Sequence, residues 1–546
     1  MALDDLVLAL QRLLDRFVRR LRVGPAPVQA GRRRLLIVQI DGLSRSVLEQ
    51  ALRERRMPFL ARLVQRTHRL APMSVGLPTS TPAFQMAAMY GVQPDIPGFH
   101  FHDKRRRADV YFPRGGDAAL VEREQARDRV GIVHGGSTYG CVFTGGALNN
   151  LFSFAMIKRP SGRGVAAVIS AWVVVAWVVV KCLTLTTITL ARFVARVFAN
   201  PLVARPTGWK WLGIKIGMSI WMREFFTLSA ARDLYGGAPA VYVNYLDYDV
   251  YSHGFGPRDR RARRVLRRVD RAIHQLWRIC RRVPEHNYDL YVLSDHGQAH
   301  CTPFHEISGG RALETFLFDE VFDRHAVREV APGRPGGRHL ARGIKAWRSH
   351  RGSGLLQRFM NYLDEDFGTN IDPAPETAER HGVRIVSAGP NAFVYFVDTP
   401  EPLTIEQIDV RHDGLVEEVS RLPGIGFVLA RSADGPVCAF RGKRYRLNEE
   451  PGPFAGRVDV DVVLDGIRDL MNMRTAGDLV IYGEDAVEGN VSFIAEIGAH
   501  AGPSPDELHT FLVAPREASL PSPIRHPRQL YDVFVRYHAG ETRSAR

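Results

Sequence analysis

The sequence predicts an α/β fold with a largely parallel central sheet covered by helices on both faces. Three short apolar runs, at residues 35–40, 240–246 and 288–294, are each closed by aspartates or a glycine turn, and helical periodicity lies between them. Runs that are apolar at almost every position are typical of parallel strands buried on both faces, and their alternation with helices is typical of α/β proteins. Ligands bind such sheets beyond the carboxyl ends of the strands, so the acidic clusters there predict the site.

The composition excludes several other classes of protein. The chain has 546 residues, more than one hydrophobic core usually serves, so insertions or a second lobe are expected. Hydrophobic residues at 45% and charged residues at 24% exclude a wholly disordered chain and a polytopic membrane protein. Five cysteines without a CxxC pair exclude a disulfide scaffold and a zinc ribbon. The net charge of +15 indicates a polyanionic partner, which leaves nucleic acid, an anionic membrane and a phosphorylated substrate open.

Residues 1–22 place apolar side chains at three- and four-residue steps, with arginines on the opposite side. This spacing predicts an amphipathic helix, which a linker joins to the core after residue 31. The helix either packs on the protein's own core or lies on an anionic membrane, and the pattern leaves both open. Acids at positions 4 and 5 and the absence of an unbroken apolar core argue against a secretory signal.

An insertion predicted at residues 161–225 contains the most apolar segment. Residues 164–180 carry no charge, and the apolar character continues to residue 190. As a helix, residues 164–190 would extend roughly 40 Å, enough for one tilted membrane span. The many valines keep a buried central strand as the alternative for part of the run. Tryptophans and lysines between residues 209 and 221 are typical of a bilayer interface.

The rest of the chain divides between a catalytic core and a smaller accessory lobe. Strand and turn patterns at 383–397 and 424–447 predict an α+β lobe, whereas the runs at 479–483 and 491–495 predict a return to core strands. Arginines dominate residues 258–282, where the apolar spacing predicts a helix with a solvated basic face. The predicted parts are core at 32–160, 226–310 and 456–530, the accessory lobe at 311–455, and a tail at 531–546.

Candidate chemical groups gather at the predicted strand ends. They comprise Asp41, a Thr-Ser-Thr triplet at 79–81, Asp249, His253, Asp295, His296 and His500. Mixed oxygen and nitrogen donors of this kind suit one or two Zn²⁺ or Mn²⁺ ions. The spacing of Asp249 and His253 places both on one face of a helical turn. Asp295 and His296 can serve one metal only in a turn, which Gly297 would supply.

The motifs around these residues resemble the alkaline phosphatase superfamily, and most closely its type I phosphodiesterase/nucleotide pyrophosphatase branch. The resemblance spans about residues 35–515 and implies a three-layer α/β/α alkaline-phosphatase-like sandwich. It rests on Val38-Gln-Ile-Asp41-Gly, Pro78-Thr-Ser-Thr81-Pro, Asp247-Tyr-Asp249-Val-Tyr-Ser-His253-Gly, Ser294-Asp-His-Gly-Gln298 and Gly498-Ala-His500-Ala-Gly502.

The resemblance implies two divalent metal ions, zinc or manganese, and a threonine nucleophile at Thr81. Metal coordination would lower the pKa of the Thr81 hydroxyl, and a phospho-threonine would form and be hydrolysed. Thr79 and Ser80 are expected to support the loop. By the same resemblance, Asp41, Thr81, Asp295 and His296 would hold one metal, and Asp249, His253 and His500 the other.

One position departs from the branch. Its phosphate-binding asparagine, about twenty residues after the nucleophile, is replaced by the segment 98–103, which contains His102. His102 either donates to a phosphoryl oxygen or is a surface residue before the basic run 104–107. The missing asparagine puts a nucleotide substrate in doubt. The signature of the sulfatase branch is also lacking after Thr81.

The order of the site residues limits the membrane topology. Asp41 and Thr81 precede the apolar segment and the other ligands follow it, so one complete span would separate them. We therefore expect residues 164–190 to form a re-entrant or in-plane insertion at the inner membrane, with the catalytic domain on the cytoplasmic face. The positive charge, including residues 104–107 and 258–282, is then expected to serve anionic lipid and a phosphorylated small-molecule or lipid substrate, with nucleic acid the least favoured partner.

The predicted function is a membrane-associated, metal-dependent phosphoester hydrolase. A phosphoryl or phosphoglycerol-type transferase acting on a lipid-linked substrate and a catalytically inactive membrane scaffold of the same fold are the alternatives. The complete ligand set argues against the scaffold.

Overall fold

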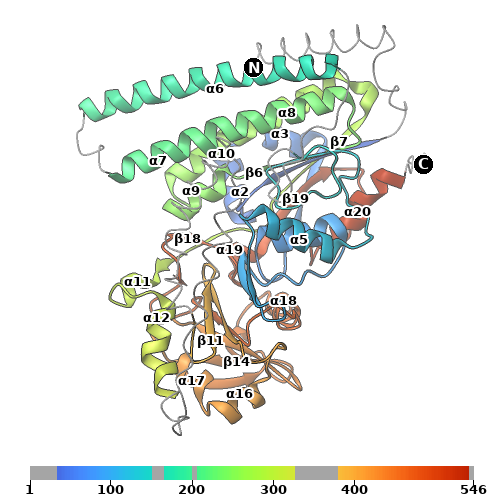
Figure 1. Cartoon of the computed structure of the whole chain (residues 1–546). Helices are drawn as coiled ribbons and strands as arrows, with labels where there is room; N and C mark the ends of the chain where they lie inside the picture. Colours follow the sequence, from blue (N-terminus) through green and yellow to red (C-terminus); the bar gives the residue numbers. More distant parts are fainter. Residues whose placement is uncertain (1–32, 151–164, 200–205, 326–378, 540–546) are drawn as a thin grey trace.

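The computed structural model of the chain describes residues 33–150, 165–199, 206–325 and 379–539. The N-terminal helix predicted at 1–22 lies outside these residues. The molecule consists of a core built on a six-stranded sheet and a smaller lobe built on a seven-stranded sheet (Figure 1).

The core sheet has the order β2-β19-β7-β1-β6-β5. The three predicted strands are its centre: β1 (Arg34–Ile40) pairs in parallel with β6 (Ala240–Tyr245) on one side and with β7 (Tyr288–Leu293) on the other. Outside them, β5 (Ser137–Tyr139) is parallel to β6. β19 (His509–Pro515) is antiparallel to both of its neighbours, β7 and β2 (His68–Ser74). The sheet is therefore mixed, with a single reversed strand among those described.

Alternate residues of β1 belong to two different hydrophobic cores, which makes the core three layers thick. Leu36, Val38 and Ile40 face helices α2 (Arg45–Arg53), α3 (Pro58–Arg66), α8 (Arg223–Gly236) and α10 (Arg260–Arg282). Leu35 and Ile37 face α4 (Thr81–Tyr90), α5 (Gly115–Ala126) and α20 (Arg528–Ala539). This mixed α/β arrangement is consistent with an alkaline-phosphatase-like fold.

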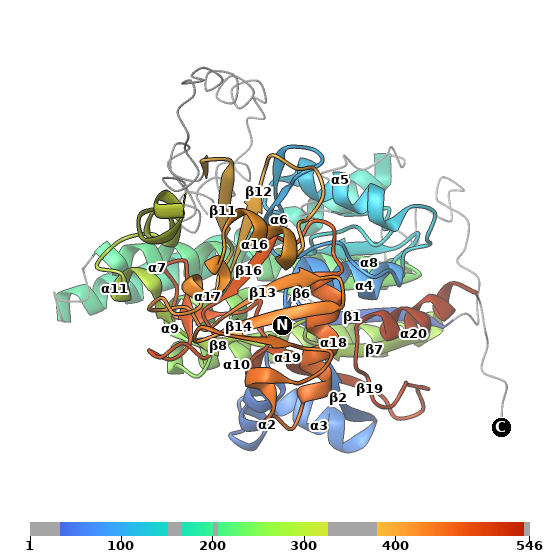
Figure 2. The same ribbon diagram turned by 90° about the horizontal axis from the view of Figure 1, so that it is seen from below.

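The lobe sheet has the order β10-β11-β12-β16-β13-β14-β15, with every neighbouring pair antiparallel. Its strand β16 (Leu479–Tyr482) is central, between β12 and β13. The sequence pattern had assigned residues 479–483 to the core, and this assignment is wrong, because an apolar run shows that a strand is buried but not in which sheet. The other strands are β10 (Glu379–Arg380), β11 (Val383–Ser387), β12 (Asn391–Phe396), β13 (Phe427–Ser432), β14 (Gly435–Phe440) and β15 (Lys443–Arg446). Figure 2 shows this lobe from below.

A buried ion pair joins the lobe to a hairpin of the core formed by β3 (His100–Asp103) and β4 (Ala108–Tyr111). The ammonium of Lys104 lies 2.9 Å from a carboxylate oxygen of Asp478, and both side chains are almost fully buried. Arg105 pairs with Glu401, and Arg106 with Glu124. The expectation that the basic run 104–107 serves lipid is thus wrong for Lys104, which is buried and paired, and it stays a prediction for the exposed arginines of the run.

The apolar insertion is helical. A single helix, α6 (Val165–Ala199), contains the whole run from 165 to 190, which excludes the alternative of a buried strand. The chain returns through α7 (Pro206–Ile216) and a π-helical turn, η2 (Gly217–Met222), into α8. Figure 1 shows α6 lying along this returning rod, on the outside of the helical layer. The stretch Ala176–Ala195 is long and apolar enough to cross a membrane by length and composition, and 17% of the window is buried.

Candidate functional site

The candidate site residues meet beyond the carboxyl ends of three adjacent parallel strands. Asp41 directly follows β1. Asp249 and His253 lie on helix α9 (Asp247–Phe255), which begins soon after β6. Asp295 and His296 follow β7 in an irregular turn, as predicted for two adjacent ligands. Two further segments complete the site: Thr81 is the first residue of α4, and His500 follows the short strand β18 (Gly498–Ala499).

The first cluster contains Asp41, Asp295 and His296, whose potential ligand atoms all lie within 4.8 Å of one another. The Nε2 atom of His296 is 3.4 Å from carboxylate oxygens of both aspartates. The hydroxyl of Thr81 lies 3.2 Å from the same Nε2 atom and 3.4 Å from Asp41 Oδ1. Thr81 therefore borders the first cluster.

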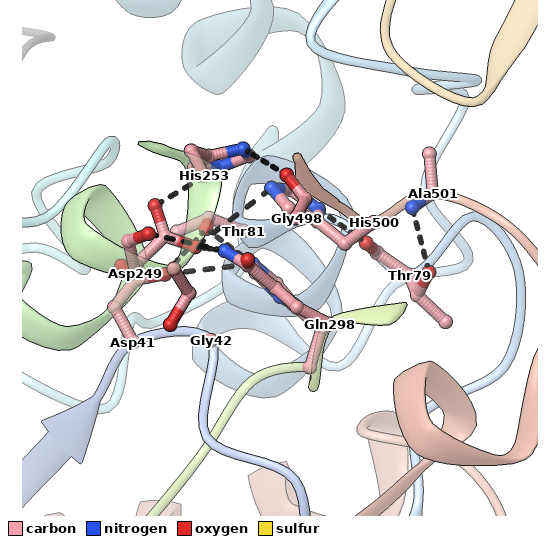
Figure 3. A network of polar contacts seen from close by, with 12 residues as sticks. Asp41, Gly42, Thr79, Thr81, Asp249, His253, Gln298, Gly498, His500 and Ala501 are labelled. Atoms are coloured by element: carbon pink, nitrogen blue, oxygen red, sulfur yellow. Dashed lines mark hydrogen bonds and ion pairs between the residues drawn. The ribbon is translucent and has the colours of Figure 1, made fainter. Parts of the chain in front are cut away.

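The second cluster contains Asp249, His253 and His500, again with potential ligand atoms within 4.8 Å. One helical turn places His253 Nε2 at 3.3 Å from Asp249 Oδ2, as the spacing predicts. The rings of His296 and His500 stack with centroids 3.7 Å apart, so the two clusters are adjacent. Figure 3 shows Asp41, Asp249, His253 and His500 converging on one space near Thr81.

The electrostatics of the first cluster suit a cation. Burial raises the pKa of Asp295 to about 7, and burial together with the charges of Asp295 and Asp249 raises the pKa of Asp41 well above its usual range. Asp295 Oδ2 is buried and has no hydrogen-bond partner among the described residues. Burial lowers the pKa of His296 to about 4 and that of His500 to about 3, so both imidazoles are neutral. Crowded carboxylates and neutral imidazoles form a donor set that fits divalent cations.

All three histidines use Nδ1 to bond the protein, which leaves Nε2 for the site. His296 Nδ1 donates to the carbonyl of Gly297 at 3.0 Å, and His500 Nδ1 donates to the carbonyl of Thr79 at 2.8 Å. His253 Nδ1 lies 2.6 Å from Glu496 Oε2 and 2.9 Å from the carbonyl of Gly498. Such partners fix the ring orientation and the tautomer of metal-binding histidines.

Several supporting residues were missed by sequence reasoning. Asn244 donates to Asp41 Oδ2 at 2.6 Å, and the side-chain amide of Gln298 donates to Asp249. Glu507 accepts bonds from the backbone N–H groups of Ala501 and Gly502 and from the hydroxyl of Thr79. Asn244 could have been recognised from the sequence, because it is the one amide side chain in the apolar run of β6. Glu496 had no such signal, because its partner His253 is distant in sequence, and the bond between Glu507 and Thr79 spans an even longer separation.

The turn after β1 needs a glycine. Gly42 has φ +72°, and a Cβ atom there would lie 2.6 Å from Asp249 Oδ1. Any larger residue would therefore combine an unfavourable backbone conformation with a clash against the second cluster. Gly42 allows the loops carrying Asp41 and Asp249 to approach closely.

The structure does not bring His102 to the two clusters. Its Nδ1 atom is 2.7 Å from Asp109 Oδ1 across the β3–β4 hairpin, and its ring contacts that of Tyr395 in the lobe. Within the described residues, His102 makes no polar contact with a cluster residue. Its position favours a structural role at the junction between core and lobe.

Comparison with known proteins gives the family. The chain has no significant match among curated proteins. A family model described as type I phosphodiesterase / nucleotide pyrophosphatase matches residues 35–366, which is more than half of the chain. Proteins of this family are phosphoester hydrolases, generally metal-dependent, that act on phosphorylated substrates such as nucleotides or phosphodiesters. The chain belongs to the type I phosphodiesterase / nucleotide pyrophosphatase family of the alkaline phosphatase superfamily.

Proposed function

We propose that the protein is a metal-dependent phosphoester hydrolase in which Thr81 is the nucleophile. The observation that carries this proposal is the position of the Thr81 hydroxyl, 3.2 Å from His296 Nε2 and beside two adjacent clusters of carboxylates and imidazoles. Asp41, Asp295, His296 and Thr81 would hold one divalent ion, and Asp249, His253 and His500 a second, with zinc or manganese as the best match to these donors. When bound, the ions would favour the threonine alkoxide and offset charge on the phosphoryl group.

The position of Thr81 at the start of α4 suits phosphoryl transfer. The N-terminus of a helix carries a partial positive charge, which stabilises a phosphoryl group held there. The neighbouring Ser80 makes no side-chain capping bond to the helix. In the first step the bond between Thr81 Oγ1 and phosphorus forms while the bond to the leaving-group oxygen breaks, and the hydroxyl proton of Thr81 passes to the leaving alkoxide by way of solvent. In the second step the oxygen of a water molecule bonds to phosphorus while the bond to Thr81 Oγ1 breaks, and a proton of that water returns to the Thr81 oxygen.

Turnover by the purified full chain tests this proposal. The protein would be stripped with a chelator and assayed on p-nitrophenyl phosphate and bis-p-nitrophenyl phosphate, with and without added Zn²⁺ or Mn²⁺. We expect the metal-loaded protein to hydrolyse at least one of the two esters. Its rate should exceed that of the stripped protein by a factor of roughly 10³ or more. Absence of turnover on both esters at all metal concentrations would overturn the hydrolase. Transfer of the phosphoryl group to added glycerol instead of water would identify the alternative transferase.

Glu496 should tune the second cluster through His253. Replacing Glu496 with glutamine removes the negative charge from the 2.6 Å contact with His253 Nδ1. Loss of such a partner typically weakens metal binding by roughly 10- to 100-fold, so we expect that weakening in a competition titration with a chromophoric chelator. Saturating metal should restore turnover. The exposed Glu449, replaced by glutamine, provides the matched control, and an unchanged affinity of the Glu496→Gln variant would contradict a positioning role.

We also propose that the enzyme works at the cytoplasmic face of the inner membrane on a phosphorylated small molecule or lipid. All five cysteines are buried and free, which is ordinary for a protein of a reducing compartment. Proteolysis of right-side-out and inverted membrane vesicles tests the orientation, because only inverted vesicles should expose the catalytic core. Cleavage in right-side-out vesicles would place it on the other face.

A further inference from the structure

The outer face of α6 is apolar and exposed along about five helical turns. Val180, Leu183 and Val194 are 53%, 52% and 45% exposed, and Phe198 is 85% exposed. No exposed residue between Ala176 and Ala191 carries a charge. The solvent-facing side of a helix in a soluble protein normally carries charged and polar residues, and a continuous apolar patch of this kind marks an interaction site.

The exposed threonines of this face use their hydroxyl groups in hydrogen bonds within the helix. Thr184 and Thr187 donate their hydroxyls to the carbonyls one turn earlier, Val180 at 2.9 Å and Leu183 at 3.0 Å. Such bonds satisfy a hydroxyl without water, and Ser and Thr residues of membrane helices use them in this way. The outer face of α6 therefore suits hydrocarbon as its partner.

The inner face of α6 is fixed to the core. Val178 and Cys182 are buried against the helical layer, and Thr186 accepts a bond of 3.1 Å from the indole of Trp221 in η2. Lys181 forms an ion pair of 2.7 Å with Glu224 at the start of α8. These contacts hold α6 lengthwise along η2 and α8, as Figure 1 shows. The helix therefore presents one side to a partner and lies parallel to the surface of the molecule.

A basic face accompanies the apolar one. Helix α10 packs against α8 in the layer that α6 covers, and its buried side faces the central sheet. Because α6, α8 and α10 belong to the layer on the same face of the sheet, the exposed side of α10 lies on the same side of the molecule as α6. Arg264, Arg267 and Arg271 are exposed on that side and make no ion pair within the described part of the chain. Arginines beside an apolar helix match anionic headgroups beside hydrocarbon.

We propose that α6 inserts in the plane of one leaflet of an anionic bilayer, with the arginines of α10 over the headgroups. The chain enters and leaves the bilayer on the same side, which is why residues before and after α6 can form one site. This proposal goes beyond the proposed function and stands whether or not the site hydrolyses phosphoesters, because it rests on surfaces outside the two clusters.

Flotation of the full chain with preformed vesicles tests the docking. Vesicles of phosphatidylcholine with about one-third phosphatidylglycerol should bind the wild type at least about 10-fold better than phosphatidylcholine alone. The double variant Leu183→Asp, Leu190→Asp should lose at least about 10-fold in partitioning, since aspartate is costly in hydrocarbon. Val410→Asp, at an exposed valine of the lobe, is the matched control. Thermal unfolding checks that each variant folds.

Two further readouts keep the proposal open to failure. Replacing Arg264, Arg267 and Arg271 with glutamate should remove the preference for anionic vesicles while leaving binding to neutral ones unchanged. Single cysteines at Ala176 and Phe198, near the two ends of the exposed face, should both react with a membrane-impermeant maleimide in the absence of vesicles, and both should be protected when anionic vesicles are bound. Protection of one end alone would show a spanning helix and overturn the proposal, as would unchanged binding by the Leu183→Asp, Leu190→Asp variant.

Discussion

Replacing Thr81 with alanine should lower turnover of the p-nitrophenyl esters by at least about 10³-fold. Removal of a nucleophile from a site that acts as a unit leaves only binding and electrostatic contributions, so losses of this size are expected. Thr81 is 7% exposed and lies at the first position of α4, where alanine is compatible with the helix. The variant should therefore fold, and it is assayed at saturating metal because it lacks one of the proposed ligands. Serine at this position should restore much of the rate, because it returns the hydroxyl.

Rapid acid quenching separates a nucleophilic role from a positioning role. With a phosphoester substrate, the wild-type peptide that contains Thr81 should carry a phosphoryl group, and the Thr81→Ala protein should carry none. Ser80→Ala is the control, because Ser80 is an adjacent buried hydroxyl with no hydrogen-bond partner among the described residues. Its turnover should stay within a few-fold of the wild type. Equal turnover by Thr81→Ala and wild type would falsify the mechanism.

The central strands could be predicted because their physical signal is local. β1, β6 and β7 are buried at every position, and a run of such residues is visible in the sequence without knowledge of its partners. Strand direction and sheet membership are not local. The reversed strand β19 and the placement of β16 in the lobe depend on how distant segments pair, which no short pattern encodes.

In the candidate site, too, local contacts could be predicted from the sequence and long-range contacts could not. Asp249 and His253 lie one turn apart, and Asp295 and His296 share a turn, so their proximity follows from spacing. Their meeting with His500 follows from the resemblance to a family and not from any local pattern. Glu496, which lies 243 positions from His253, could only be found from the structure. His102 was a candidate only because it lies in the segment where the family's asparagine is expected, and its bond to Asp109 across the hairpin favours a structural role.

Replacing Asp295 with asparagine should weaken metal binding and lower turnover by roughly 10²- to 10³-fold, and yet stabilise the metal-free protein. The carboxylate is fully buried, its Oδ2 atom has no hydrogen-bond partner among the described residues, and burial raises its pKa to about 7. An asparagine has no charge to bury. Its amide could donate to His296 Nε2, which lies 3.4 Å from Oδ2 and is an acceptor because Nδ1 donates to Gly297. The gain should be on the order of 1–3 kcal/mol at pH 8.

The sign of the pH dependence follows from the raised pKa. An aspartate titrates near pH 4 in the unfolded chain and near pH 7 in the folded, metal-free protein, so between these values the folded state binds more protons. The unfolding free energy of the stripped wild type should therefore fall as pH rises from about 4 to about 7, and Asp295→Asn should reduce that slope. Urea unfolding in the presence of chelator measures both, with exposed Asp465→Asn as the matched control. An unchanged slope in the Asp295→Asn variant would show that Asp295 is not the carboxyl group whose raised pKa causes the pH dependence. The expected result is a steeper loss of stability with rising pH in the wild type than in the variant. It would show that the metal-free site carries uncompensated negative charge, which bound cations would offset.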